Sequence, residues 1–376
     1  MNDIEISIIC NTYNQVHYID KALESLVAQK TSVPFEIIVH DDCSTDGTVN
    51  VVRKYEKMYP SLVRVFVEIE NQYSRGKNIT RDILLPHIRG KYIALCEGDD
   101  YWIDDTKIQK QWEAMEHHKE CDMCACRSII VEENGKTIKG EVRPNKCNSI
   151  LPPEKVIVGG GRYIATPSLF YRKSLYDMKT QFESVISFDF TLQIKGSLRG
   201  GIYYIDYAMA AYRDLAKGSW SLNVARDRDK IKKHYEREIR MLEVLDYETE
   251  GRYHDSIEKR IEAYTPFYDQ LMNHREEFLN ELASCRDGIW IWGMGLRGDA
   301  AQKFCKNEKI VIDGVCDKQN TGLGEKTEHG QVVDSTENCL KKSKAILASN
   351  NIIYNYLIDE GYPGVLINLQ KYMPLS

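Results

Sequence analysis

The sequence predicts an α/β protein with three parts: a doubly wound, mostly parallel sheet, a helical connector and a second, smaller parallel sheet. Three observations lead to this prediction. Strand-like and helix-like segments alternate over the first hundred residues and again near the end of the chain. Polar clusters follow several of the strands, and a glycine-rich turn follows the first strand of the last segment. Such alternation is typical of parallel sheets with right-handed crossovers, whose ligands bind outside the carboxyl ends of the strands.

The first hundred residues contain four apolar segments that we expect to be strands. They lie at residues 5–14, 35–41, 62–70 and 91–96. Between them, apolar residues recur at helical spacing, which predicts helices over residues 19–30, 48–59 and 79–89. Pro60 ends the second of these helices, because proline cannot continue a helix.

Polar clusters stand at the ends of three of these strands, at residues 11–14, 41–44 and 97–100. Because the carboxyl ends of parallel strands meet at one edge of a sheet, we expect the three clusters to lie together. Asp99 and Asp100 are adjacent, and carboxylates resist burial unless they are paired or bind a metal. A lone pair of acids would most simply be a solvated turn, but three polar strand ends at one edge favour a divalent-cation site.

The composition excludes several classes of protein. With 376 residues, 43% of them hydrophobic, and a net charge of -6, the chain lacks the basic character of a protein whose main partner is nucleic acid. No window reaches the ~18 to 20 apolar residues of a membrane span, and no signal-peptide pattern opens the chain. We therefore expect a cytoplasmic protein, and peripheral contact with the inner face of the membrane stays open.

Eleven cysteines without regular pairing suit a reducing compartment better than a disulfide framework. Three of them cluster at Cys121, Cys124 and Cys126, where a zinc site is conceivable. No second cysteine or histidine pair follows at the required spacing, so these thiols are expected in the core of a strand.

Residues 223–284 are charge-rich, nearly free of glycine and proline, and helically periodic. The mixed signs of the charges indicate solvated faces of two or three connector helices. A basic stripe facing a membrane around residues 226–233 is the weaker interpretation, because Asp227 and Asp229 interrupt it. These helices are the natural place for a contact between two copies of the chain.

The last segment again begins with a strand, followed by Gly293, Gly295 and Gly298 in the spacing G-x-G-x-x-G. Asp317 ends the next predicted strand about 20 residues later, which completes the dinucleotide-binding fingerprint. The pattern predicts a Rossmann-like fold and, more weakly, a nicotinamide cofactor, because about 90 residues make half of a full dinucleotide domain. The predicted domains are residues 1–222, 223–284 and 285–376.

Residues 4–220 resemble the family 2 glycosyltransferases, whose catalytic domain has the GT-A fold. Three motifs carry the resemblance in the family's order: SIICNTYN, EIIVHDDCSTDGT and RGKYIALCEGDDYW. The resemblance implies that Tyr13 packs on the nucleotide base with Asn11 nearby, and that Asp42 hydrogen-bonds the base while Asp41 shapes its pocket. Cys43 stands where the family commonly has glycine, so the turn's backbone is expected to differ slightly.

The same resemblance implies a metal site and a catalytic base. Asp99 would lie near the ribose and the metal, and Asp100 would bind Mg²⁺ or Mn²⁺ directly. Hard oxygen ligands suit these cations, which stabilise the charge of a diphosphate leaving group. Asp189 would take the proton from the acceptor hydroxyl, although Phe188 stands where the family often has an acid. A helix cap is an alternative role for Asp189, and Asp206 is the second candidate for the base.

Three basic residues are candidates for donor binding. Arg213 and Lys217 fall where relatives often have a loop over the diphosphate, and Arg81 stands at a position that aids donor binding in the family. A surface ion pair is an equal alternative for Arg81.

Together these features predict a metal-dependent glycosyltransferase, and the resemblance to family 2 implies that it inverts the anomeric centre. The expected donor is a nucleoside-diphosphate sugar, and the expected acceptor is a saccharide, lipid-linked saccharide or glycoconjugate, in the synthesis of surface polysaccharide or other glycans. Two alternatives rest on the glycine-rich segment near the end of the chain: an NAD-dependent oxidoreductase and a nucleotide-sensing module.

Overall fold

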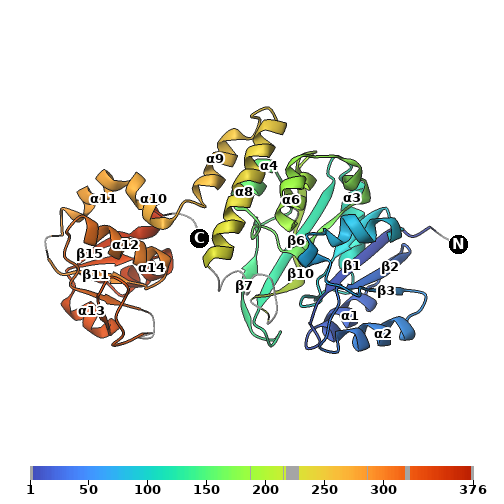
Figure 1. Cartoon of the computed structure of the whole chain (residues 1–376), viewed down its shortest axis with the longest axis horizontal. Coiled ribbons are helices and arrows are strands. Elements are labelled where there is room, and N and C mark those ends of the chain that lie inside the picture. Colours follow the sequence, from blue (N-terminus) through green and yellow to red (C-terminus); the bar gives the residue numbers. More distant parts are fainter. Residues whose placement is uncertain are drawn as a thin grey trace. The chain divides into compact units, whose positions relative to one another are not determined.

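The computed structural model describes residues 3–186, 188–214, 216, 228–285, 287–317 and 322–373. The chain divides into two compact units, Met1–Arg260 and Ile261–Ser376 (Figure 1). The helices of the predicted connector are divided between them: α8 (Arg228–Glu248) falls in the first unit, and α10 (Phe267–Asn273) and α11 (Arg275–Leu282) fall in the second. A separate connector domain with boundaries at 223 and 284 remains a prediction.

The first unit is built on a ten-stranded sheet in the order β3-β2-β1-β4-β9-β6-β10-β5. Its first four strands are parallel, as predicted; they are β1 (Ile6–Thr12), β2 (Phe35–Asp41), β3 (Val63–Val67) and β4 (Tyr92–Leu95). Alternate residues of β1 and β2 are buried against α1 (Ile19–Val27) and α2 (Thr48–Met58), which accounts for the apolar character of these segments.

The other strands extend the sheet beyond β4. β9 (Phe170–Arg172) runs antiparallel between β4 and β6 (Met123–Val131), and β10 (Ile202–Arg213) is parallel to β6. Three short strands, β5 (Tyr101–Trp102), β7 (Ile138–Val142) and β8 (Ser149–Leu151), pair antiparallel with β10, β6 and β10 respectively. Cys121, Cys124 and Cys126 are buried free thiols, as expected for core residues.

Several shorter elements complete the first unit. They are α3 (Lys107–His117), α4 (Pro153–Gly159), α5 (Phe182–Val185), α6 (Asp189–Ser197) and α9 (His254–Glu262). Residues 79–89 differ from the prediction of one α-helix. They form a π-helical turn (Ile79–Leu84) and a 3-10 turn (Leu85–His87). Pro86 explains the difference, because it has no N–H to donate and is tolerated only in the first turn of a helix.

The second unit contains a five-stranded sheet in the order β13-β12-β11-β14-β15. All neighbouring strands are parallel, so the prediction of a second, smaller parallel sheet is confirmed. The strands are β11 (Ile289–Trp292), β12 (Gly314–Cys316), β13 (Val333–Asp334), β14 (Ala345–Ala348) and β15 (Val365–Asn368), connected through α12 (Leu296–Asn307), α13 (Thr336–Lys342) and α14 (Asn351–Asp359).

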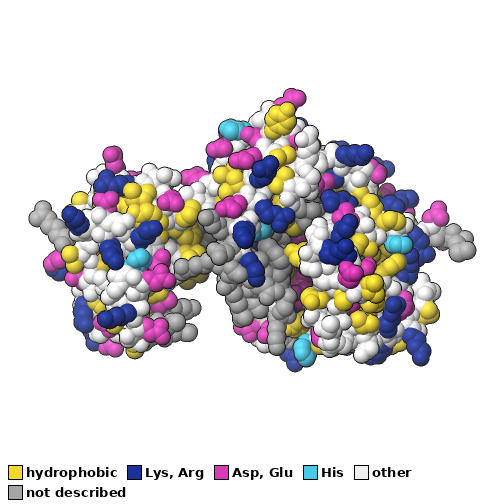
Figure 2. All heavy atoms as spheres, viewed as in Figure 1, with side chains coloured by type: hydrophobic (Ala, Val, Ile, Leu, Met, Phe, Trp, Pro, Cys, Tyr) yellow, Lys and Arg dark blue, Asp and Glu magenta, His cyan; other side chains and the backbone are white. Residues whose placement is uncertain are grey.

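On the face shown in Figure 2, lysine and arginine side chains are interspersed with aspartate and glutamate side chains over both units. This mixture agrees with the low net charge of the chain. Among the described helices, none combines the length and the apolar character that crossing a bilayer requires.

Candidate active site

Three polar strand ends meet at one edge of the first sheet. Thr12 at the end of β1 pairs with Asp41 at the end of β2, and β4 lies parallel to β1 on its other side. Residues 11–14, 41–44 and 97–100 are therefore brought together by strand pairing. The main chain joins them further, since Asp42 N donates to Thr12 O over 3.0 Å and Gly98 N donates to Asn11 O over 2.9 Å.

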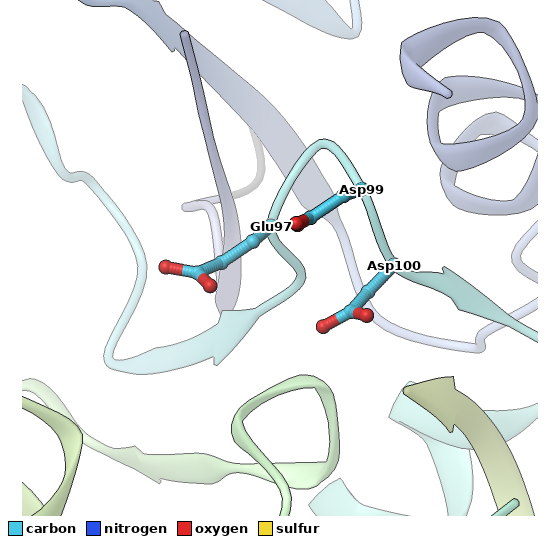
Figure 3. Close-up of side chains that lie close together, drawn as sticks. All are labelled: Glu97, Asp99 and Asp100. Atoms are coloured by element: carbon cyan, nitrogen blue, oxygen red, sulfur yellow. The ribbon is translucent and has the colours of Figure 1, made fainter. Parts of the chain in front are cut away.

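Three carboxylates gather in the loop between β4 and β5. One oxygen each from Glu97, Asp99 and Asp100 lies within 4.8 Å of the others, and Figure 3 shows the three side chains leaving the same loop. Asp99 and Asp100 are buried, with 8% and 2% of their surface exposed, and Glu97 is half-buried. The sequence predicted two metal ligands, Asp99 and Asp100, and the structure adds Glu97 as a third candidate.

Gly98 allows this loop to lie against the end of β1. A Cβ at position 98 would lie 2.4 Å from Gln15 Oε1 and 2.8 Å from Thr12 Oγ1, both far inside van der Waals contact. Any other residue would push the loop away from β1. Gly98 thereby fixes where the flanking carboxylates Glu97 and Asp99 stand.

Arg213, at the end of β10, holds the loop of residues 97–100 (the acidic loop) from another side. Its main-chain N donates to Asp100 Oδ1 over 2.8 Å, and its Nε donates to the Asp99 carbonyl over 2.7 Å. Nη1 donates to the Glu133 carbonyl, and the guanidinium lies 4.7 Å from the centre of the Tyr18 ring. The side chain is 4% exposed, so in this structure it positions the loop. Its predicted phosphate contact remains a prediction.

The electrostatics of the acidic loop disfavour three negative charges at once. Burial raises the pKa of Glu97 well above its usual range, and the nearby Asp189 charge raises it further. Burial and the Asp99 charge likewise raise the pKa of Asp100 well above the ordinary aspartate value. Three hard oxygen donors at this spacing fit Mg²⁺ or Mn²⁺, which would relieve their mutual repulsion.

The residues predicted around the nucleotide base line the adjoining part of the edge. Tyr13 is 44% exposed, which leaves a face of the ring for stacking. Asp41 Oδ1 accepts from Ser44 N over 2.9 Å. Asp41 Oδ2 and Asn11 Oδ1 are buried and have no hydrogen-bond partner in the described part of the chain. Buried oxygens of this kind are normally satisfied, so these two atoms are suited to a ligand's donors.

Asp42 is already engaged by the chain itself. Its two carboxylate oxygens accept from Gln72 N over 2.7 Å and from Tyr73 N over 3.0 Å. Asp42 therefore orders residues 72 and 73 at the edge of the site, and its predicted hydrogen bond to the base remains a prediction. Beside it, Cys43 has φ of 69°, so the turn keeps the left-handed conformation that suits the family's glycine.

Asp189 is the first residue of α6. Its Oδ2 accepts a hydrogen bond from Thr166 Oγ1, in the turn before β9. Burial raises its pKa above the ordinary aspartate value, and the Thr166 hydrogen bond offsets part of this effect. The charge of Asp189 helps to raise the pKa of Glu97, so the two carboxyl groups lie close enough to interact. No capping hydrogen bond of the carboxylate is observed among the described residues, which disfavours the helix-cap alternative.

The remaining candidates lie apart from this cluster or outside the described residues. Asp206 forms a bidentate ion pair with Arg143, with distances of 2.8 and 2.7 Å, which indicates a structural role. Arg81 pairs with Asp82 on the surface, with Nε 2.8 Å from Oδ1. This contact matches the alternative considered for Arg81. Lys217 lies outside the described residues.

Sequence reasoning missed two members of the site. Glu97 lies in the same acidic motif as Asp99, so the motif itself was the signal. Thr166 had no signal, because it comes 23 residues before Asp189 in the chain and reaches it only in the folded state.

Comparison with known proteins agrees with this geometry. The family model described as Glycosyl transferase family 2 matches residues 7–202, just over half of the chain. Uncharacterized protein Rv1520 of Mycobacterium tuberculosis is 34% identical over 217 residues, which cover 57% of this chain and 60% of that protein. TarS of Staphylococcus aureus, a poly(ribitol-phosphate) beta-N-acetylglucosaminyltransferase, is 28% identical over 174 residues, which cover 46% of this chain and 28% of TarS.

A solved structure has the same fold. Residues 1–349 of S. aureus TarS, in complex with UDP-GlcNAc, superpose with a TM-score of 0.51 at 19% sequence identity. The superposition covers 82% of this chain and 84% of that chain. At this level of identity the likeness shows the fold alone.

Proposed function

The chain belongs to glycosyl transferase family 2, and from this premise we propose that it transfers a sugar from a nucleoside-diphosphate donor to a glycan acceptor with inversion at the anomeric carbon. The observation that carries the proposal is the group of three carboxylates in one loop, Glu97, Asp99 and Asp100. Asp189 lies close enough to this group to interact with Glu97. A nucleotide side and an acceptor side thus border the same small site.

The nucleotide side is formed by the ends of β1 and β2. The exposed ring of Tyr13 stacks on the base, and the unpaired oxygens of Asn11 and Asp41 accept hydrogen bonds from it. Asp42 keeps the neighbouring segment in place through the amides of Gln72 and Tyr73. Since Asn11 and Asp41 lie in paired strands and Asp42 is held by main-chain hydrogen bonds, these three groups need little ordering when the donor binds.

The diphosphate side is the acidic loop. Glu97, Asp99 and Asp100 would hold Mg²⁺ or Mn²⁺, which when bound would neutralise charge on the diphosphate leaving group. Gly98 and Arg213 hold the loop in position for this role, one by its lack of a side chain and the other by hydrogen bonds.

Asp189 acts as the general base. The acceptor oxygen forms a bond to the anomeric carbon while the bond from that carbon to the diphosphate oxygen breaks. The acceptor's proton passes to Asp189, and the diphosphate leaves with the bonding electron pair. A raised pKa suits this task, because a base whose pKa lies closer to the working pH accepts a proton more effectively. Thr166 orients the carboxylate through its hydrogen bond.

The names of the relatives support the proposed acceptor class. TarS is named for transfer of N-acetylglucosamine to poly(ribitol-phosphate), a glycan-like polymer, and its N-terminal part has the same fold. The matched segment covers 60% of the length of the mycobacterial relative Rv1520, so the substrates of the whole protein are part of the proposal. We take UDP-GlcNAc as the first donor to test and a cell-surface polysaccharide or polyol-phosphate polymer as the acceptor class.

The proposal is tested with Asp100→Asn. The amide retains the oxygen that accepts from Arg213 N but is a poor ligand for a divalent cation. We expect loss of UDP-GlcNAc turnover, measured as UDP release with Mn²⁺, together with loss of the rise in melting temperature that Mn²⁺ and UDP give the wild type.

Asp105→Asn is the matched control. Asp105 lies on the surface five residues further along the chain, paired with Lys30, so this variant should behave like the wild type. Wild-type turnover by Asp100→Asn, or turnover that persists in EDTA, would show that the acidic loop does not hold a catalytic metal. If no nucleoside-diphosphate sugar in a panel of UDP, GDP and dTDP donors is consumed or bound, the proposed function is wrong.

A further inference from the structure

The sheet of the second unit has a point at which its connections diverge. α12, which follows β11, packs on the face formed by Ile289 and Ile291. α14, which follows β14, packs on the opposite face with Trp290 and Trp292. Since β11 and β14 are adjacent, the two connections leave neighbouring strands toward opposite faces of the sheet. In open parallel sheets this divergence, at the carboxyl edge, is where ligands bind.

The three glycines after β11 are there for different reasons. Gly293 has φ of 105°, and a Cβ on it would lie 1.9 Å from Ser349 Oγ. A Cβ on Gly298 would lie 1.9 Å from the Gly293 carbonyl oxygen. Packing within the second unit therefore requires glycine at both positions. Gly295 is different, because its φ of -70° suits any residue and nothing lies within 4 Å of the Cβ position.

Gly295 stands where α12 begins. It is the N-cap of this twelve-residue helix, it is exposed, and no side chain caps the helix there. The first N–H groups of a helix have no partner within the helix and carry partial positive charge. With no side chain at position 295, the space in front of these groups stays open, as close approach of a phosphate requires.

A hydroxyl that follows the neighbouring strand lies at the same place. Ser349 comes directly after β14 and is 7% exposed as a residue, and no hydrogen bond of its Oγ is found among the described residues. The Oγ is not one of the side-chain atoms that are fully cut off from solvent. It lies against Gly293, in the loop that leads into α12. This hydroxyl is therefore available to donate to a ligand at the start of α12.

An acid stands at the end of the strand on the other side of β11. Cys316, the last residue of β12, pairs with Trp292, the last residue of β11, and Asp317 comes next. In nucleotide-binding sheets of this order, an acid at this position accepts hydrogen bonds from ribose hydroxyls and repels a 2′-phosphate.

We propose that the second unit binds a ribonucleotide that carries a diphosphate and a free ribose 2′-hydroxyl, at the carboxyl edge between β11 and β14. The diphosphate lies over Gly295 at the start of α12, Ser349 donates its hydroxyl to a phosphate oxygen, and Asp317 receives the ribose. NAD(H) and nucleoside-diphosphate sugars share this chemistry. The site is separate from the acidic loop of the first unit and needs no metal ion.

The test is calorimetric titration of the full chain with NAD⁺, NADP⁺ and UDP-GlcNAc in EDTA. We expect saturable binding of NAD⁺ or of UDP-GlcNAc, which identifies the source of the ligand, and at least tenfold weaker binding of NADP⁺ than of NAD⁺ if NAD⁺ is the ligand. Gly295→Asp should lower the affinity at least tenfold, because its carboxylate occupies the phosphate position. The variant should fold, since aspartate is a favourable N-cap residue.

Two further variants make the result specific. Asn355→Asp adds the same charge on the exposed surface of α14, and its affinity should equal that of the wild type. Ser349→Ala should weaken binding severalfold without lowering the melting temperature, because the hydroxyl has no partner to lose. Binding of none of the three nucleotides up to millimolar concentration overturns the proposal. Binding that Gly295→Asp leaves unchanged also overturns it, since the nucleotide would then be bound elsewhere.

Discussion

Individual side chains around the acidic loop have either a chemical role or a positioning role, and their surroundings distinguish the two. Asp189 accepts one hydrogen bond from Thr166 and lies close enough to interact with Glu97. Arg213, by contrast, is buried and bound to main-chain carbonyls. The two residues should therefore respond differently to substitution.

Asp189→Asn should transfer sugar about 10² to 10⁴ times more slowly, the usual loss when a general base is removed. The amide has the same size and can still accept from Thr166, so donor binding and the melting temperature should stay close to those of the wild type. Steady-state transfer assays and UDP titrations measure the two effects. Asp177→Asn, at an exposed aspartate, is the control, and an active Asp189→Asn variant would assign the base elsewhere.

The pH dependence of transfer gives a second test of Asp189. A base works only when it is deprotonated, and burial raises the pKa of this carboxyl above the ordinary aspartate value. The rate should therefore fall as the pH is lowered through this raised pKa, at a higher pH than an exposed aspartate would give. In Asp189→Asn the slow residual transfer should lack this acid limb. An unchanged limb in the variant would mean that it reports another group.

Arg213→Lys should mainly lower stability and metal affinity. Lysine keeps the charge but cannot reach both main-chain carbonyls, and a buried carbonyl left without a partner costs about 1 to 3 kcal/mol. Urea unfolding and Mn²⁺ titration measure the two losses. Arg199→Lys, at an exposed arginine paired with Asp122, is the control. If Arg213→Lys raised the KM for donor with no change in stability or metal affinity, a direct phosphate contact would explain it better.

At the scale of elements, the site depends on how closely the loop after β4 approaches the end of β1. Gly98 is the point of contact, with Thr12 and Gln15 on the other side. The same strand ends that gather the polar residues thus leave no room for a side chain between them.

Gly98→Ala should displace the acidic loop, because the added methyl group meets Thr12 and Gln15 at less than 3 Å. Overpacking of this kind costs about 1 to 3 kcal/mol, and Mn²⁺ affinity should fall with it. Gly295→Ala is the control, since its Cβ would enter open space at an ordinary φ. Equal stability and metal binding in both variants would contradict a close approach of the loop to β1.

At the scale of the whole molecule, the boundary between the units determines what can be removed. α10 and α11 pack with the second sheet, where Leu271, Phe278 and Leu282 share a core with Phe304 of α12. Each motif assigned to transfer lies before residue 221, in the first unit. We therefore expect the second unit to be dispensable for the chemistry that we propose.

Truncation after residue 262 should leave a folded protein that still hydrolyses UDP-GlcNAc with Mn²⁺. Truncation after residue 284 should aggregate, because it keeps α10 and α11 but removes the sheet that buries their apolar faces. Gel filtration and UDP release compare the two proteins. A well-folded 1–262 fragment without any donor turnover would show that the second unit contributes to the active site.

The local sequence by itself determined the α/β class, the two sheets and the family. Residues 6–10 and 37–39 are buried on both faces of the sheet. A strand buried on both faces is recognisable in the sequence as a nearly continuous apolar run. The acidic motif and the glycine fingerprint were equally local, since each lies within a few neighbouring residues.

Only the tertiary structure decided which residues meet. Thr166 reaches Asp189, Arg213 reaches the loop 113 residues before it, and Glu97 joins Asp99 and Asp100 as a third carboxylate. It also showed that Gly293 and Gly298 are required by packing while Gly295 is not. Periodicity reports which face of an element is buried, whereas contacts between distant segments depend on strand order and loop path. A single sequence does not contain that information in readable form.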